Sequence, residues 1–218
     1  MPFEIAFIYR NFPVLAEGLL VTLQISGFSI IIATVAGLLI GLARLSRRPA
    51  IRIVASTYVE FMRNTPLLHQ LFLLYFGLPV IGIRIPGFGV ALLGLAGLHA
   101  AFMAEVFRSG IESISARQEE AGLALGMTRG EVMRKVILPQ AIPASIPPLV
   151  NQLVLLIKDS SLLATIGIAE LTLRGRVLAE GTAATYEVFV AVGLLYLIVT
   201  GTVSGVGRWL EPRLRPVK

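Results

Sequence analysis

The sequence predicts an all-α protein that crosses a membrane about five times. Hydrophobic residues make up 56% of the 218 residues, and charged residues make up only 15%, against roughly 25% in an average soluble domain. The mean hydropathy is +0.82. Long apolar runs end in clusters of basic residues, which is typical of helices that span a bilayer. We therefore expect a polytopic helical membrane protein.

Five apolar runs are long enough to cross a bilayer as helices. They cover approximately Leu19–Ala43, Ile51–Ile83, Val90–Val106, Ile142–Ile168 and Ala184–Val206. Polar residues and Pro66 interrupt the second run, and Lys158 and Asp159 lie inside the fourth.

The basic residues fall into two groups that predict the orientation of these spans. The larger group would lie at one membrane face and comprises Arg44, Arg47, Arg48, Arg52, Arg117, Arg129, Arg134, Lys135 and the basic C-terminus. The smaller group comprises Arg10, Arg84, Arg174 and Arg176. The positive-inside rule places the larger group in the cytoplasm, so we expect the N-terminus outside and the C-terminus inside.

This orientation divides the chain into three parts. Residues 1–18 would form an extracytoplasmic segment, 19–209 the transmembrane domain, and 210–218 a basic cytoplasmic tail. No basic region precedes an apolar stretch at the N-terminus, so we expect no cleavable signal peptide.

Composition and motifs exclude several classes of function. The chain has no Cys, and His69 and His99 are its only histidines, so we expect no metal site and no catalytic Ser-His-Asp arrangement. It has no Gly-x-x-x-x-Gly-Lys-Ser/Thr run, so we expect no nucleotide or other cofactor on this chain. The net charge of +6 is spread over the ends of apolar runs, which does not indicate nucleic-acid binding.

A polar block at about 112–140, between the third and fourth apolar runs, is the most informative segment. Ser115 and Gln118 stand in N-cap and N3 relation, so they predict the start of a short helix. Gly126 follows the last apolar residue of that helix, as a glycine in the C′ position does.

The second arm of this block has its own start signals. Thr128 and Glu131 form a capping-box pattern, and Met127 and Val132 are placed as the hydrophobic staple. Pro139 is expected to end this second helix. The block therefore predicts a hairpin of two short helices at the cytoplasmic face.

The spacing of this block resembles the EAA motif of ABC importer permeases, the loop that docks on the ATP-hydrolysing subunit. Gly122 stands where that family usually has a second Ala, and Val136 where it usually has Ile, and both replacements keep the position small or apolar. The resemblance implies that the residues that dock the ATPase are Glu120, Ala121, Gly122, Gly126, Leu138 and Pro139.

Further motifs, in the same order, resemble polar amino-acid permeases from about Gly18 to Trp209. They are Tyr58–Leu68 with Gln70–Phe72 and Tyr75–Pro79, Ala104–Ile111, Lys158–Leu162 and Ile168–Leu171. Asn64, His69 and Ser109 depart from the residues usual in that family. The resemblance implies a multi-pass subunit of the bacterial inner (plasma) membrane that imports a polar amino acid. Its implied partners are a second permease chain, identical or paralogous, an ABC ATPase that holds ATP and Mg, and an extracytoplasmic solute-binding protein.

The polar residues within the apolar runs are candidates for the substrate pathway, because charges in a bilayer usually face a cavity or one another. Glu60 and Arg63 are three residues apart on one helical face and would pair with each other. Glu105 and Arg108 have the same spacing and would form a paired anchor near the cytoplasmic surface. Pro66 lacks an amide donor, so the helix should break at Thr65 and line an enclosed cavity.

Two interpretations remain open for the fourth run. Either its helix is short and Lys158 and Asp159 reach the outer headgroups, or a discontinuity near mid-membrane lets Asp159 meet a ligand amine. In the second case Thr65 or free amides after Asn64 would bind the substrate carboxylate, with Asn151 and His69 near its side chain. The predicted pathway residues are Glu60, Arg63, Asn64, Thr65, His69, Asn151, Lys158 and Asp159. The competing view is an unselective passage with all selectivity in the binding protein.

Other functions are weaker alternatives. An energy-independent carrier or channel would leave the hairpin without a role, and carriers commonly show two repeated halves that this sequence lacks. An intramembrane enzyme would need a nucleophile and base that are not evident. The small-residue spacings Gly37–Gly41 and Gly201–Gly205 predict close helix packing.

Overall fold

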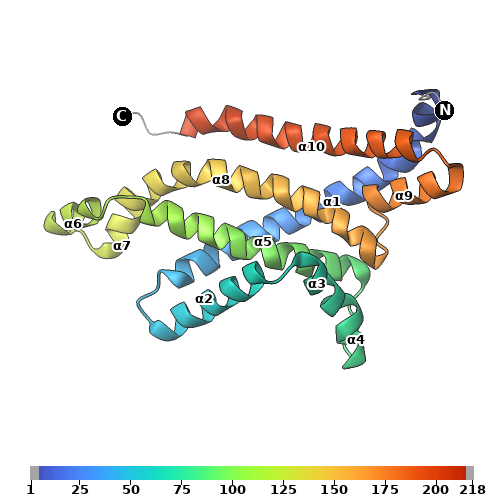
Figure 1. Cartoon of the computed structure of the whole chain (residues 1–218). Coiled ribbons are helices and arrows are strands. Elements are labelled where there is room, and N and C mark those ends of the chain that lie inside the picture. The colour runs from blue at the N-terminus through green and yellow to red at the C-terminus, as the bar shows by residue number, and fades with distance from the viewer. Residues whose placement is uncertain (1–4, 215–218) are drawn as a thin grey trace.

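The computed structural model describes residues 5–214, and within this range it contains helices and no strand. The long helices lie lengthwise beside one another (Figure 1). They are α1 (Ile5–Arg44), α5 (Gly87–Glu112), α8 (Leu138–Asp159) and α10 (Thr185–Leu214). Four stretches of the described chain are long and apolar enough to cross a membrane, namely Ala6–Arg44, Gly87–Glu112, Arg129–Ile166 and Thr185–Arg213. With the shorter apolar stretch Leu67–Val80, the expectation of about five membrane helices is confirmed.

The centre of the bundle is the contact between α1 and α5. Small residues allow the two backbones to approach closely: a Cβ on Gly37 would lie 2.7 Å from Cβ of Met103, and one on Gly41 would lie 2.9 Å from the carbonyl oxygen of Ala104. Ala33, Ala96 and Leu156 are buried in the same core cluster, so α8 closes over this contact. The packing predicted for Gly37–Gly41 is confirmed. Nothing in the described chain lies within 4 Å of a Cβ at Gly201 or Gly205, so the packing predicted for these two glycines stays a prediction.

The second apolar run does not form one span. It divides into α2 (Pro49–Asn64), α3 (Leu67–Phe72), a π turn η1 (Leu73–Gly77) and α4 (Leu78–Val80). Thr65 and Pro66 adopt extended backbone angles between α2 and α3, so the predicted break at Thr65 is confirmed. The physical cause is Pro66, which disfavours helical angles for the residue before it.

The end of the second hairpin helix was predicted incorrectly. Pro139 does not end it, because α7 (Arg129–Val132), the π turn η2 (Met133–Ile137) and α8 follow one another without a break. A proline ring clashes with the carbonyl four residues earlier, and for Pro139 that residue, Lys135, lies inside the π turn. The π turn η1 contains Tyr75, which stands in the same relation to Pro79. In both places the wider turn accommodates the proline, so the helix continues.

The two ends of the bundle carry the two groups of charges that the sequence separates. The short helices α6 (Ala116–Ala124) and α7 lie at one end, together with the α1–α2 connection and the C-terminal end of α10 (Figure 1). The N-terminal end of α1 and the short helix α9 (Leu171–Thr182) lie at the other end. This arrangement matches the predicted sidedness, with the larger basic group at the hairpin end.

The first and last long helices extend beyond the predicted apolar runs. Helix α1 already begins at Ile5 rather than near Leu19, and it accommodates Pro13 within its length. Residues 1–4 of the predicted extracytoplasmic segment lie outside the described residues. Helix α10 continues through 210–214 of the predicted tail, and residues 215–218 lie outside the described range.

Candidate functional site

We name the polar block at 112–140 the coupling hairpin. Its first arm is helix α6, which ends in a turn at Gly126. Helix α6 has Ser115 at its N-cap, although the serine side chain makes no capping hydrogen bond. At the other end Gly126 has φ +79°, a left-handed conformation that suits glycine. The amide of Gly126 donates to the carbonyl of Leu123, and that of Met127 donates to Gly122. These two bonds form a Schellman motif, so the predicted role of Gly126 at the C′ position is confirmed.

The second arm begins with the predicted capping box. The amide of Glu131 donates to the hydroxyl oxygen of Thr128, and the amide of Thr128 donates to the carboxylate of Glu131. Val132, one turn later, is fully buried against Gly122. The sequence therefore folds each arm locally, and the contact between Gly122 and Val132 joins them.

The outer surface of the hairpin presents a shallow groove of about 300 Å³. Its lining residues are Arg117, Gln118, Ala121, Gly122, Leu125, Met127 and Val136. Leu125, one of these lining residues, is 83% exposed and leaves apolar area free for a partner.

Some of the predicted docking residues lie on this surface, and the others lie beneath it, at the turn or at the start of α8. Glu120 and Ala121 are exposed on α6, Gly122 is buried beneath them, and Gly126 makes the turn. Leu138 and Pro139, at the end of the hairpin, begin α8. Two contacts between the arms, Arg129 with Glu119 at 3.1 Å and Gln140 with Gln118 at 2.7 Å, hold them together.

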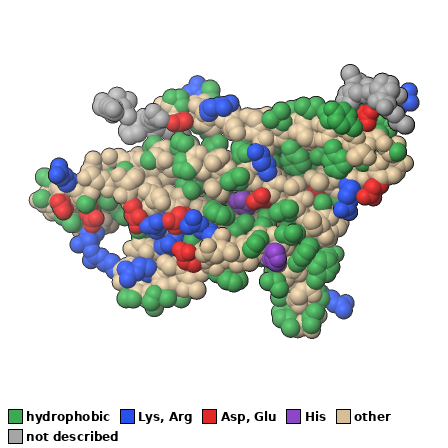
Figure 2. All heavy atoms as spheres, viewed as in Figure 1, with side chains coloured by type: hydrophobic (Ala, Val, Ile, Leu, Met, Phe, Trp, Pro, Cys, Tyr) green, Lys and Arg blue, Asp and Glu red, His purple; other side chains and the backbone are tan. Residues whose placement is uncertain are grey.

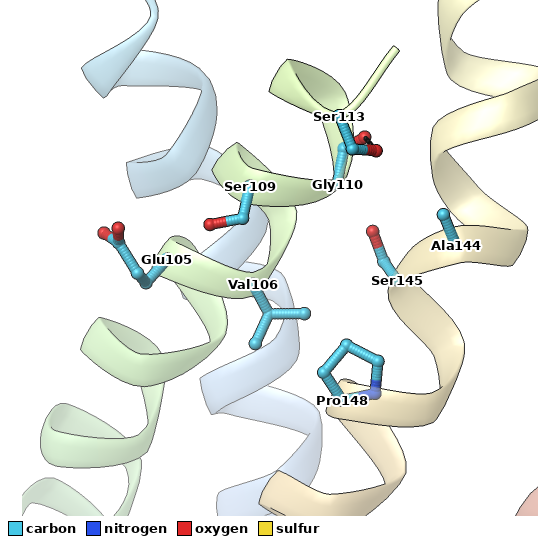
Figure 3. Close-up of a pocket in the computed structure, with 8 residues that line it drawn as sticks. All are labelled: Glu105, Val106, Ser109, Gly110, Ser113, Ala144, Ser145 and Pro148. Atoms are coloured by element: carbon cyan, nitrogen blue, oxygen red, sulfur yellow. Dashed lines mark hydrogen bonds between the residues drawn. The ribbon is translucent and has the colours of Figure 1, made fainter.

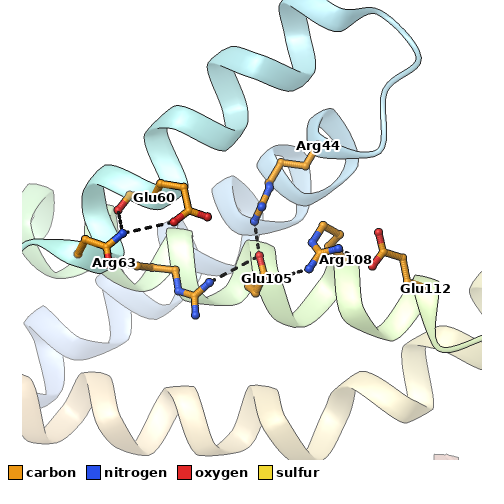
Figure 4. A network of polar contacts seen from close by, with 7 residues as sticks. Arg44, Glu60, Arg63, Glu105, Arg108 and Glu112 are labelled. Carbon is orange, nitrogen blue, oxygen red and sulfur yellow. Dashed lines mark hydrogen bonds and ion pairs between the residues drawn. The ribbon is translucent and has the colours of Figure 1, made fainter.

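A network of ion pairs joins α1, α2 and α5 near the hairpin end (Figure 4). The Glu105 carboxylate pairs with Arg44 and Arg108, and Nη1 of Arg63 lies 3.8 Å from it. Arg108 also pairs with Glu112. The predicted pairing of Glu105 with Arg108 is confirmed.

The predicted pairing of Glu60 with Arg63 is wrong. The Arg63 guanidinium turns toward α5, where it pairs with Glu105 and lies 5.4 Å from the ring centroid of Phe102. Glu60 instead accepts a hydrogen bond from the Asn64 side chain at 3.3 Å (Figure 4). A carboxylate on a neighbouring helix and an aromatic face together hold the guanidinium, and spacing along one helix cannot show either of them.

A small pocket of about 310 Å³ separates the ends of α5 and α8 beside this network (Figure 3). Val106, Ser113 and Pro148 face it, and Glu105 points away toward the other helices (Figure 3). A Cβ on Gly110 would lie 2.0 Å from Oγ of Ser145, so glycine is required for this close approach. The pocket is mostly apolar and offers no titratable group beyond Glu105.

At the break between α2 and α3, side chains donate hydrogen bonds to nearby backbone carbonyls. The Thr65 hydroxyl donates to the carbonyl of Phe61, and the Asn64 amide donates to that of Glu60. The buried Gln70 side chain donates to the carbonyls of Met62 and Thr65. The Thr65 and Asn64 side chains are thus engaged locally, and a contact between Thr65 and a substrate carboxylate remains a prediction.

One contact between α5 and α8 has no signal in the sequence. Nε2 of His99 lies 3.1 Å from Oδ2 of Asp159, which ends α8 where the chain enters the 3₁₀ segment η3 (Ser160–Ile166). His99 is 1% exposed, and the Asp159 side chain is 37% exposed. The Phe102 ring lies 6.3 Å from the His99 ring, so Phe102 connects this pair with Arg63 at the α2–α3 break.

The other predicted pathway residues lie apart from Asp159. Asn151 lines a pocket of about 400 Å³ between α8 and α10, and eight residues of α-helix place it roughly 12 Å from Asp159 along the axis. Lys158 is exposed on α8, and His69 is exposed on α3.

Charged side chains lie in a band across the middle of one face, with hydrophobic side chains on both sides (Figure 2).

A buried carboxylate at the opposite end was also missed as a structural feature. Glu170 is fully buried and caps α9 by accepting hydrogen bonds from the amides of Thr172 and Leu173. The Tyr196 hydroxyl donates to it at 2.8 Å, which links α9 to α10. Burial raises the pKa of Glu170, and these hydrogen bonds oppose the shift. The Glu170 contacts are structural, because two of them cap α9 and the third joins α9 to α10.

Comparison with known families identifies the class of protein. Residues 5–216 match the family described as the binding-protein-dependent transport system inner membrane component. The chain belongs to this family. It is therefore a permease subunit of an ABC importer in the inner membrane, and a secondary carrier is not supported.

Relatives align with the permease over nearly its whole length. The probable amino-acid ABC transporter permease protein PatM of Vibrio harveyi is 35% identical over 217 residues, covering 98% of this chain and 97% of PatM. The glutamine transport system permease protein GlnP of Escherichia coli (strain K12) is 39% identical over 217 residues, covering 99% of each chain.

Solved structures share the fold of the permease. A crystal structure of an amino acid ABC transporter with histidines has a TM-score of 0.92 at 35% identity and covers 98% of this chain and 100% of its own. An inward-facing structure of the MetNI methionine ABC transporter has a TM-score of 0.81 at 23% identity, covering 95% of this chain and 99% of its own, and it supports the fold alone.

Proposed function

We propose that this permease imports polar amino acids and that Asp159 binds the α-ammonium group of the substrate. Relatives at 35% and 39% identity carry the names of amino-acid and glutamine permeases. The observation that carries the proposal is the position of the Asp159 carboxylate, which is partly exposed yet lies deep in the bundle.

The depth of Asp159 in the membrane follows from the position of its partner, His99. His99 lies midway along the 26-residue α5, and the Asp159 carboxylate is 3.1 Å from its ring. A residue halfway along a helix of this length lies near the middle of a bilayer roughly 30 Å thick. This depth supports the substrate interpretation over an anchor at the outer headgroups. A carboxylate there is costly without a positive partner, and a substrate ammonium supplies one.

The coupling hairpin is the proposed docking site for a separate ATPase chain, which holds ATP and Mg. Exposed apolar area at Leu125, exposed Glu120 and a rigid turn at Gly126 form a surface of defined shape. A solute-binding protein would deliver the amino acid at the opposite end, near α9. A second permease chain, identical or paralogous, would complete the transport pathway.

The continuity of α7, η2 and α8 supports a direct mechanical link between these two sites. The docking hairpin forms the beginning of this helical segment, and Asp159 ends α8. Closure of the ATPase on binding ATP would displace the hairpin. Because α8 is one continuous helix, although it contains Pro143, Pro147 and Pro148, the displacement would reach Asp159 and open the permease outward.

The experiment is uptake of L-glutamine into vesicles that contain the full transporter with its binding protein and ATPase. Asp159→Asn keeps the size of the side chain and removes its charge, so we expect a loss of at least about tenfold in uptake, as for a lost charge-assisted hydrogen bond. Glu180→Gln, an exposed acid on α9, is the matched control and should transport normally. Wild-type uptake by Asp159→Asn would contradict the ammonium site and favour an unselective passage.

A further inference from the structure

Within the described chain, His99 is the one histidine that lies in the core of the bundle, and its buried ring contacts Asp159. Its ring is buried on α5, whereas the Asp159 side chain remains partly exposed on its other side. One carboxylate oxygen of Asp159 is engaged by His99 at 3.1 Å, so the other oxygen is free to face a ligand. This geometry suits a group that orients the carboxylate and does not itself touch the substrate.

The surroundings of His99 decide which of its nitrogens carries hydrogen. Nδ1 is buried and has no hydrogen-bond partner within residues 5–214. A protonated imidazole would donate from both nitrogens, and a buried N–H group without an acceptor is costly. The hydrogen on Nε2 therefore donates to Asp159, the acceptor that the ring contacts within residues 5–214.

We propose that His99 is a positioning residue for substrate capture, because it fixes the rotamer of Asp159 and directs its free oxygen toward the amine of the transported amino acid. This inference rests on the ammonium site proposed above. Phe102 lies beside the His99 ring and under Arg63, so it keeps the imidazole in place from the other side.

The test uses two substitutions of His99. One keeps a hydrogen-bond donor and loses the ring, and the other keeps the ring and loses the donor. His99→Gln keeps an N–H group near the position of Nε2 but loses the ring. His99→Phe keeps the ring and loses the donor. Each variant is reconstituted in vesicles as the full transporter, and the amount of radiolabelled L-glutamine delivered per ATP hydrolysed is measured with saturating loaded binding protein.

If His99 positions Asp159, His99→Gln should stay within about threefold of wild type, and His99→Phe should fall by about tenfold or more. The double variant His99→Phe/Asp159→Asn should be no worse than Asp159→Asn alone, because both remove the same interaction. Should His99→Phe fail to assemble, His99→Met, a flexible side chain without a donor, takes its place.

Four results would overturn the inference. Delivery by His99→Phe equal to or better than that by His99→Gln would show that the imidazole acts through packing. Additive losses in the double variant would show that the two residues act independently. Normal delivery by Asp159→Asn would remove the ammonium site itself, whereas impaired delivery by Asp159→Asn with normal delivery by His99→Phe would remove only the role of His99.

Discussion

A Cβ on Gly122 would lie 2.7 Å from Cγ2 of Val132, so the two arms of the coupling hairpin meet where no side chain fits. Gly122 belongs to α6 and Val132 to α7, and both are buried. The angle between the arms therefore depends on this contact as well as on the turn at Gly126. A larger residue at Gly122 must separate the arms, because Val132 is stiff and enclosed.

The first prediction concerns this contact. Gly122→Leu should destabilise the hairpin by about 1–3 kcal/mol through overpacking and reduce uptake and ATPase association. The additional substitution Val132→Ala should restore part of the loss, since it removes the opposing methyl groups. Gly130→Leu is the control, because a Cβ there meets nothing within 4 Å. Equal effects at Gly122 and Gly130 would show that the contact between the arms is unimportant.

The second prediction concerns orientation. The chain has no native Cys, so single introduced cysteines can be labelled without background. Cysteines at Ser46, Arg129 and Lys218 should react only from the cytoplasmic side, and those at Gly87 and Gly181 only from outside. An external position for Arg129 would contradict both the topology and the proposed docking face.

The third prediction separates two acids that pair with the same arginine. Glu105 is largely buried among Arg44, Arg63 and Arg108, whereas Glu112 is half exposed. Glu105→Ala leaves buried positive charge uncompensated and should destabilise the permease by about 3 kcal/mol. Glu112→Ala should cost about 1 kcal/mol or less. Thermal unfolding of the purified transporter in detergent measures both, and equal shifts in Tm would contradict the assigned role of Glu105.

The features that the sequence predicted correctly are those determined within a few residues. The Thr128–Glu131 capping box, the left-handed Gly126 and the break before Pro66 each depend on local backbone chemistry. The same local reasoning failed at Pro139, because the π turn that contains Lys135 accommodates the proline. A π turn has no clear sequence signal, so the continuous helix from α7 into α8 could not be predicted.

The two ion pairs that the sequence did not reveal, His99 with Asp159 and Arg63 with Glu105, join residues distant along the chain. His99 and Asp159 are 60 residues apart, and only the packing of α5 against α8 brings them together. Arg63 had a plausible partner three residues away in Glu60, but Glu105 on α5 lies within reach and is surrounded by other arginines. Gly37 and Gly201 have the same local spacing, yet only Gly37 meets a neighbouring helix.

The most direct test of the account is whether the hairpin turn controls association with the ATPase. The Gly126 backbone is left-handed and a Cβ there has open space, so substitutions report on backbone conformation alone. Gly126→Val should cost at least about 1–2 kcal/mol, and Gly126→Asn, which tolerates this conformation, should cost much less. Co-purification of the ATPase with each full-length variant, at equal membrane insertion, is the measurement. We expect strong loss with Gly126→Val and retention with Gly126→Asn, and normal ATPase association in Gly126→Val would contradict the hairpin as the docking element.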